Sequence, residues 1–135
     1  MIGYPSLKAK QALQQYGQLQ QLQASEANPH KMISMLFAGA VEALNNMSGA
    51  MANGRSDVKG QAASKAIAII NGMRDCLDLQ QGQELAQNLY GLYSYLSTLV
   101  FQANYENDIS KVCEVRDLLQ SVQASWDCMP QANSE

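Results

Sequence analysis

The chain has 135 residues, which suits one domain with a substantial hydrophobic core that needs neither disulfides nor a metal. Only 16% of the residues are charged and the formal net charge is -3, so the sequence offers no basic surface for a nucleic-acid partner. Three cysteines without a CxxC pair, no export signal and no apolar run of about 20 residues together predict a cytoplasmic protein that does not insert into a membrane.

Residues 1–26 predict an N-terminal segment with one short helix that docks weakly, because the run is rich in Gln and Ala and poor in apolar area. Tyr16 and Leu19 are the side chains in it that we assign a covering role. Two interpretations stay open: a terminal helix that covers an edge of the core, or a detachable lid.

The next helix is predicted from Pro29 to about Ala52, because Asn28 is a good N-cap and proline is tolerated at the first helical position. Its apolar stripe runs from Ile33 to Met51, and Met32 and Met35 fall on another side. The sequence NGRSD then predicts a stop, followed by a cap from the serine or the aspartate.

Apolar stripes with capping and stop residues predict two more helices. One is predicted from Val58 to Leu79, ending around Gly82, and its Ile67 lies off the apolar stripe. The last begins after Asn107 or Asp108 and ends before Pro130.

Between them, residues 84–105 carry more apolar surface than one side of a helix can bury. A stripe in steps of three and four residues predicts a core face. Tyr90 and Phe101 project well outside this stripe, with Tyr105 further round and Tyr95 on the opposite flank. The helix is therefore either packed nearly all round or keeps one flank for a partner. The stripe consists of Leu85, Leu89, Leu92, Leu96, Leu99 and Ala103, widened by Tyr93 and Val100.

Together these elements predict an all-α fold: an antiparallel up-down four-helix bundle over residues 27–129, with an additional short N-terminal helix and a disordered tail at 130–135.

The sequence predicts no enzyme, because it contains no recognisable catalytic, cofactor-binding or metal-binding residues. The single histidine, His30, excludes a paired Glu-x-x-His metal site, and the carboxylates form no facing pair that the spacing reveals. A histidine phosphotransfer bundle, which would carry the phosphoryl group on His30, is the first alternative function. The start of a helix is a poor place for phosphoryl transfer.

Four segments resemble the flagellar secretion chaperone family FliS in order and spacing. They are ANPHKMISMLFAGAVEAL (27–44), SKAIAIINGMRDCLD (64–78), QELAQNLYGLYSYL (83–96) and ANYENDISKVCEVRDLLQSVQASW (103–126). Ala38, Phe37 and Ser94 depart from the family pattern, which usually has Asp, Tyr and Asp at these positions.

This resemblance implies a cytoplasmic helical bundle that binds the C-terminal region of flagellin in an apolar groove, prevents its premature polymerisation and keeps it competent for type III export. The flagellar export apparatus is a further implied partner. We expect Tyr16 and Leu19 to cover the groove. The groove itself is predicted to be lined by Ile33, Phe37, Ile67, Ile70, Leu77, Leu89, Tyr90, Tyr93 and Tyr95. A structural homodimer that buries the surplus apolar face is the second alternative.

Overall fold

The structure is a computed structural model that describes residues 29–128 of the chain. The described residues form four helices and no strand: α3 (Pro29–Ala52), α4 (Ser56–Asp75), α5 (Leu79–Glu106) and α6 (Ile109–Cys128). The predicted all-α class and the four long helices are confirmed. The N-terminal helix that we predicted, with Tyr16 and Leu19, lies outside the described residues, as does the C-terminal tail.

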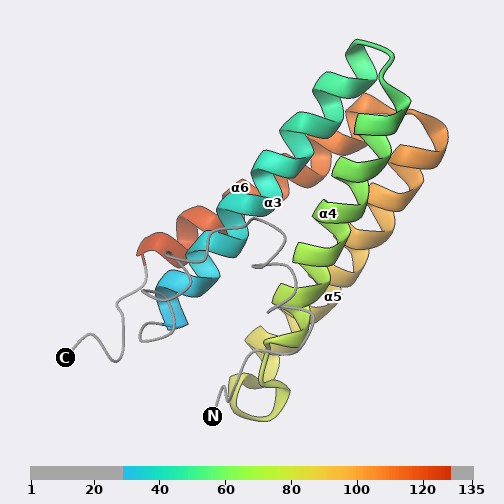
Figure 1. Ribbon diagram of the computed structural model, residues 1–135. Helices are drawn as coiled ribbons and strands as arrows, with labels where there is room; N and C mark the ends of the chain where they lie inside the picture. Colours follow the sequence, from blue (N-terminus) through green and yellow to red (C-terminus); the bar gives the residue numbers. More distant parts are fainter. Residues whose placement is uncertain (1–28, 129–135) are drawn as a thin grey trace.

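The helices pack as a ring in which α3 contacts α4 and α6, and α5 contacts the same two helices. Short connections join consecutive helices, so neighbours in the chain run antiparallel (Figure 1). The starts of α3 and α5 therefore share one end of the bundle with the ends of α4 and α6. The 53–55 and 107–108 turns lie at the other end, which we call the closed end.

The closed end is held by local hydrogen bonds that its sequence explains. Gly54 adopts a left-handed φ of 68°, as a glycine stop after α3 requires. Asn107 ends α5 with a φ of 56°, and Asp108 accepts hydrogen bonds from the Ser110 N–H at 3.0 Å and the Ser110 hydroxyl at 2.6 Å. The Lys59 ammonium of α4 donates to the Asn104 carbonyl oxygen at 3.1 Å, which ties α4 to the end of α5.

The connection from α4 to α5 differs from the prediction. α4 ends at Asp75 rather than Leu79, and Asp78 starts α5 by accepting hydrogen bonds from the N–H groups of Gln80 and Gln81, both at 3.1 Å. The expected boundary near Gly82 instead appears as a kink inside α5, at Gln83. The predicted cap of α4 was also wrong, because the N-cap is Arg55 and its side chain makes no capping hydrogen bond.

The kink leaves room only for glycine at the position before it. A Cβ atom at Gly82 would clash with the Ala86 Cβ, so this turn excludes any larger residue. Gln83 adopts φ 50° and ψ -128°, which is unfavourable for a residue with a side chain and costs about 1–3 kcal/mol.

The core runs along the bundle axis and is made of large aliphatic and sulfur-containing side chains from all four helices. Met32 belongs to this core although it lies outside the main apolar stripe of α3. Leu85, which we predicted in the core stripe of α5, is 62% exposed. The most completely buried side chains include Leu36, Phe37, Leu44, Met47, Ile69, Ile70, Leu96, Val100, Val112, Val115 and Leu119.

A pair of leucine substitutions checks this division between core and surface. Leu44→Ala should lower the free energy of unfolding by about 2–5 kcal/mol, because Leu44 is fully buried and its removal leaves a cavity. Leu85→Ala is the matched control and should change it by less than about 1 kcal/mol. Urea denaturation followed by circular dichroism measures both; equal losses would contradict the assigned core.

The Asp108 cap predicts a specific pH dependence. The hydrogen bond from the Ser110 side chain, and then the Lys111 backbone N–H, hold the pKa of the Asp108 carboxyl below its ordinary value. Its contribution to stability is therefore complete above the ordinary aspartate pKa and is lost as the pH falls through the lowered value.

Asp108→Ala should accordingly be less stable than the natural chain at pH 7, and the difference should shrink as the pH is lowered below about 4. Thermal unfolding of both proteins across this range measures the difference. A gap that stays constant down to about pH 2 would show that the carboxylate is not what stabilises the turn.

Candidate binding surface at the open end

At the end of the bundle opposite the closed end, apolar side chains that point inward are only partly covered. We call this the open end: the starts of α3 and α5 with the ends of α4 and α6. In Figure 1 the α3–α6 pair and the α4–α5 pair diverge toward this end.

The stripe on α5 shows the effect most clearly. Residues at steps of three and four share one face of a helix, so Leu85, Leu89 and Leu92 face the same way as the buried Leu96 and Leu99. Nevertheless Leu85 is exposed, and Leu89 and Leu92 are only partly buried. The leucines of this helical face are thus less covered in its first half than in its second.

On the other three helices, too, some apolar side chains toward the open end are only partly covered. On α6, Val122 and Trp126 continue the stripe of buried valines and leucines but are only partly covered. On α3 and after α4, Ile33 and Leu77 are also partly covered. Exposed or partly covered apolar side chains from α3, the α4–α5 connection and α5 therefore lie toward this end of the bundle. We call them the open-end patch: Ile33, Leu77, Leu85, Leu89 and Leu92.

One aromatic pair fixes the α3–α6 side of the open end. The rings of His30 and Trp126 stack with centroids 4.5 Å apart and planes 12° from parallel. The His30 Nε2–H donates to the Trp126 carbonyl oxygen at 3.1 Å, and the Trp126 indole N–H donates to the His30 carbonyl oxygen at 3.2 Å. Because the carbonyl can only accept, the contact places the His30 proton on Nε2.

The nine residues predicted to line a groove are divided by the structure into three groups. Phe37, Ile70 and Tyr93 are buried in the core. Ile33, Ile67, Leu77 and Leu89 are partly buried beside it. Tyr90 and Tyr95 are exposed, by 40% and 48%.

Burial gives Tyr93 the environment of a core residue, and it raises the pKa of the Tyr93 hydroxyl well above its ordinary value. Tyr93→Asp would therefore disrupt folding, so it could not serve as a test of binding.

The two exposed tyrosines lie on different seams of the bundle. Tyr90 sits beside α4, where the Arg74 guanidinium lies 5.4 Å from the centre of its ring. Tyr95 lies beside α6 and donates from its hydroxyl to the Glu114 carboxylate at 2.9 Å, a hydrogen bond that raises the pKa of Tyr95. The structure thus does not bring Tyr90 and Tyr95 together.

Leu85 and Leu92 are the open-end residues that the predicted groove omitted. Their spacing placed them in the core stripe, and no local signal in the sequence tells where along a stripe the facing helices stop covering it.

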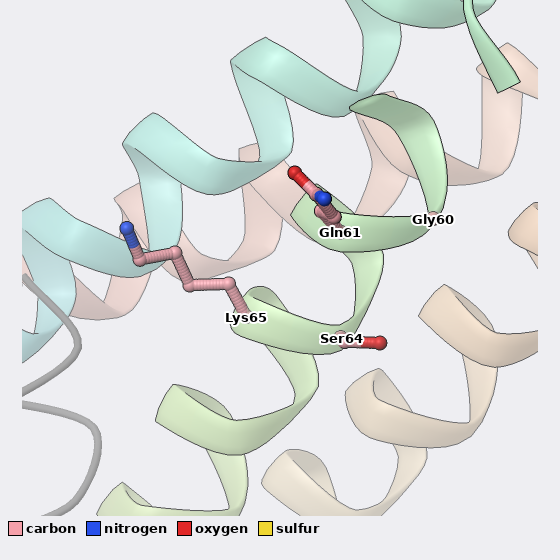
Figure 2. A pocket seen from close by; sticks show the side chains of 4 residues that line it. All are labelled: Gly60, Gln61, Ser64 and Lys65. Atoms are coloured by element: carbon pink, nitrogen blue, oxygen red, sulfur yellow. The ribbon is translucent and has the colours of Figure 1, made fainter. Parts of the chain in front are cut away.

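A shallow depression on α4 is lined by Gly60, Gln61, Ser64 and Lys65. Figure 2 shows the Lys65 and Ser64 side chains pointing in opposite directions instead of converging on a common point. All four lining residues come from one helix and none has an apolar side chain, so the depression lacks the convergent groups of a ligand site.

Residues 29–128 also lack two other kinds of functional feature. No group of three or more His, Cys, Asp or Glu side chains gathers there as a metal site would need. Within the same range, none of the helices is long and apolar enough to cross a membrane.

Comparison with known proteins gives one consistent result. The family model described as "Flagellar protein FliS" matches residues 12–133. The chain is 42% identical over 120 residues to flagellar secretion chaperone FliSB of Pseudomonas aeruginosa, a match that covers 88% of this chain and 95% of that protein. It is 43% identical over 101 residues to flagellar secretion chaperone FliS of Salmonella typhimurium, covering 74% and 75%.

The flagellar secretion chaperone FliS of Vibrio cholerae is 38% identical over 108 residues, which cover 80% of this chain and 79% of that protein. The family match spans most of the chain and includes all four described helices. The chain therefore belongs to the FliS family of flagellar proteins.

Proposed function

We propose that this protein is a cytoplasmic export chaperone that binds the C-terminal segment of flagellin at the open-end patch. In this proposal residues 27–129 form the binding bundle, and residues 1–26, with Tyr16 and Leu19, cover the patch when flagellin is absent. The chaperone prevents premature polymerisation and delivers flagellin to the flagellar export apparatus. It has no catalytic role.

The observation that carries the proposal is the uncovered half of the α5 stripe. Leu85 is exposed, and Leu89 and Leu92 are only partly buried, although all three lie on the apolar stripe of the helix. Fully burying an exposed leucine side chain contributes about 1.5–3 kcal/mol. Leu85 would gain most of this and the partly buried leucines a fraction of it, which works against the cost of ordering a flexible segment, about 2–5 kcal/mol. The names of the relatives, flagellar secretion chaperones, support the choice of a flagellar cargo.

A helical cargo fits this patch better than an extended one. Its apolar side chains come from helices with a repeat of three to four residues, which is the spacing that an amphipathic helix presents. The resemblance to the FliS family implies such a cargo, because the C-terminal segment of flagellin is an amphipathic polymerisation segment that becomes ordered only when it assembles. Bound in the patch, its polymerising face would be shielded.

Calorimetric titration with the C-terminal peptide of flagellin from the same source tests the proposal. Leu85→Glu should weaken binding about tenfold or more, because it places a charge among apolar contacts, while the exposed position leaves the fold intact. Phe101→Glu is the matched control: Phe101 is 64% exposed on the outer side of the same helix, and its variant should bind as the natural chain does.

Unchanged affinity for Leu85→Glu, with a helical spectrum preserved, would refute binding at the open-end patch. A loss confined to Phe101→Glu would place the cargo on the outer face of α5 and refute the proposed site equally.

The phosphotransfer alternative rests on His30 and gains no support from its surroundings. Its Nε2 is occupied by the Trp126 carbonyl and its ring by the indole. Incubation with acetyl phosphate should therefore leave the mass of the protein unchanged. A phosphoryl adduct that appears in the natural chain and is absent from His30→Ala would restore the signalling alternative.

A further inference from the structure

An asparagine followed directly by a glycine occurs twice in the chain, at Asn53–Gly54 and at Asn71–Gly72. The first pair forms the turn between α3 and α4 at the closed end, where both residues are exposed. The second pair lies inside α4, where Gly72 is buried. The same dipeptide therefore stands in two environments, one open to water and one packed in the bundle.

An asparagine in this position can react with the backbone that follows it. The backbone nitrogen of Gly54, once it has lost its proton, attacks the Asn53 Cγ atom. The new N–Cγ bond closes an imide ring, the Cγ–Nδ2 bond breaks, and ammonia leaves. Water then opens the ring at either carbonyl group and gives aspartate or isoaspartate, so water is the only co-reactant. Glycine favours ring closure because it has no Cβ atom to obstruct the approach.

The turn leaves the reacting groups of Asn53 and Gly54 accessible. The Gly54 N–H donates to the Met51 carbonyl oxygen at 3.3 Å, which is long for an N–H donor. Among residues 29–128 the Asn53 side-chain amide has no hydrogen-bond partner. No atom lies within 4 Å of a Cβ built at Gly54, so the space around the turn is open. Neither a strong hydrogen bond nor packing holds the amide away from the Gly54 nitrogen.

The second pair is held in place by its neighbours. The Ser97 hydroxyl of α5 donates to the Asn71 Oδ1 atom at 2.6 Å. The Gly72 N–H belongs to the interior of α4, where backbone N–H groups donate along the helix. Ring closure would require Asn71 to leave Ser97 and this turn of α4 to open, which costs free energy. The fold therefore protects Asn71 and leaves Asn53 unprotected.

We propose that Asn53 is a site of spontaneous deamidation, and that isoaspartate at this position loosens the α3–α4 connection. In isoaspartate the main chain runs through the side-chain carbon atoms, which inserts one CH₂ group before Gly54. The N–H groups of Gly54 and Arg55 donate to the Met51 and Ala50 carbonyl oxygens across this turn. The inserted atom moves both donors away from their acceptors. The Arg55 side chain makes no cap at the start of α4 that could compensate. The site lies at the closed end and is independent of flagellin binding.

Peptide mass spectrometry of the full chain, aged at mildly alkaline pH, tests the site itself. Asn53 should be deamidated at least about tenfold faster than Asn71, because α4 must open locally before Asn71 can react. In concentrated guanidinium chloride the two asparagines should react at similar rates, since they share the same dipeptide. Asn53→Gln should abolish the reaction at this position, because glutamine would have to close a larger and less favourable ring.

Thermal unfolding of the aged protein tests the effect on the turn. Asn53→Asp is the matched control, because it carries the charge of the deamidated residue without the inserted CH₂ group. The isoaspartate form, separated by chromatography, should unfold at least about 4 °C below Asn53→Asp. Asn53→Asp itself should unfold within about 2 °C of the natural chain, because Asn53 is exposed.

Two results would overturn the deamidation site: an Asn53 that stays intact throughout ageing, or equal rates at Asn53 and Asn71 in the folded chain. Equal unfolding temperatures for the isoaspartate form and Asn53→Asp would overturn the loosening of the turn.

Discussion

The structure depends on how far four apolar stripes can cover one another. In the closed half, the stripes of α3, α4, α5 and α6 meet around a common axis and exclude water. The helices continue beyond the last complete layer of that core, and their stripes continue with them. Because the stripe of α5 repeats every three to four residues without interruption, the exposed Leu85 and the buried Leu96 differ only in what lies opposite them. Surplus apolar surface is therefore a consequence of helix length and divergence, and needs no special motif.

Much of the fold could be predicted from the sequence, because the signals that define it are local. Pro29 marks the start of α3, Gly54 its stop, and Asp108 the cap of α6, and each acts through its own backbone geometry or hydrogen bonds. Helical periodicity also placed Tyr90, Tyr95, Phe101 and Tyr105 outside the core stripe, but it left open whether another helix covers them. In the structure all four are exposed.

The division between core and binding surface could not be predicted in the same way. Phe37, Ile70 and Tyr93 were expected at the groove and lie in the core, whereas Leu85 was expected in the core and lies at the surface. Residues of both groups occupy inward helical faces, and only the facing helices decide their burial. The kink at Gln83 was missed for a related reason: Asp78 provides a cap earlier than the glycine suggested, so α5 starts before the kink instead of after it.

The hydrogen bond between Lys59 and the end of α5 helps to determine where the helices can tilt relative to one another. The Lys59 ammonium joins α4 to the end of α5 at the closed end, and Asn107 and Asp108 form the tight turn between α5 and α6 there. The helices are therefore held together at this end and are freer to tilt at the other. Leu85 lies about 30 Å along the helix axis from the closed end of α5, at 1.5 Å per residue. A tilt of only about 5° between the two helix pairs would shift its position by about 2.6 Å over that length. A small tilt at the closed end is therefore amplified at the open end, where Leu85 is exposed.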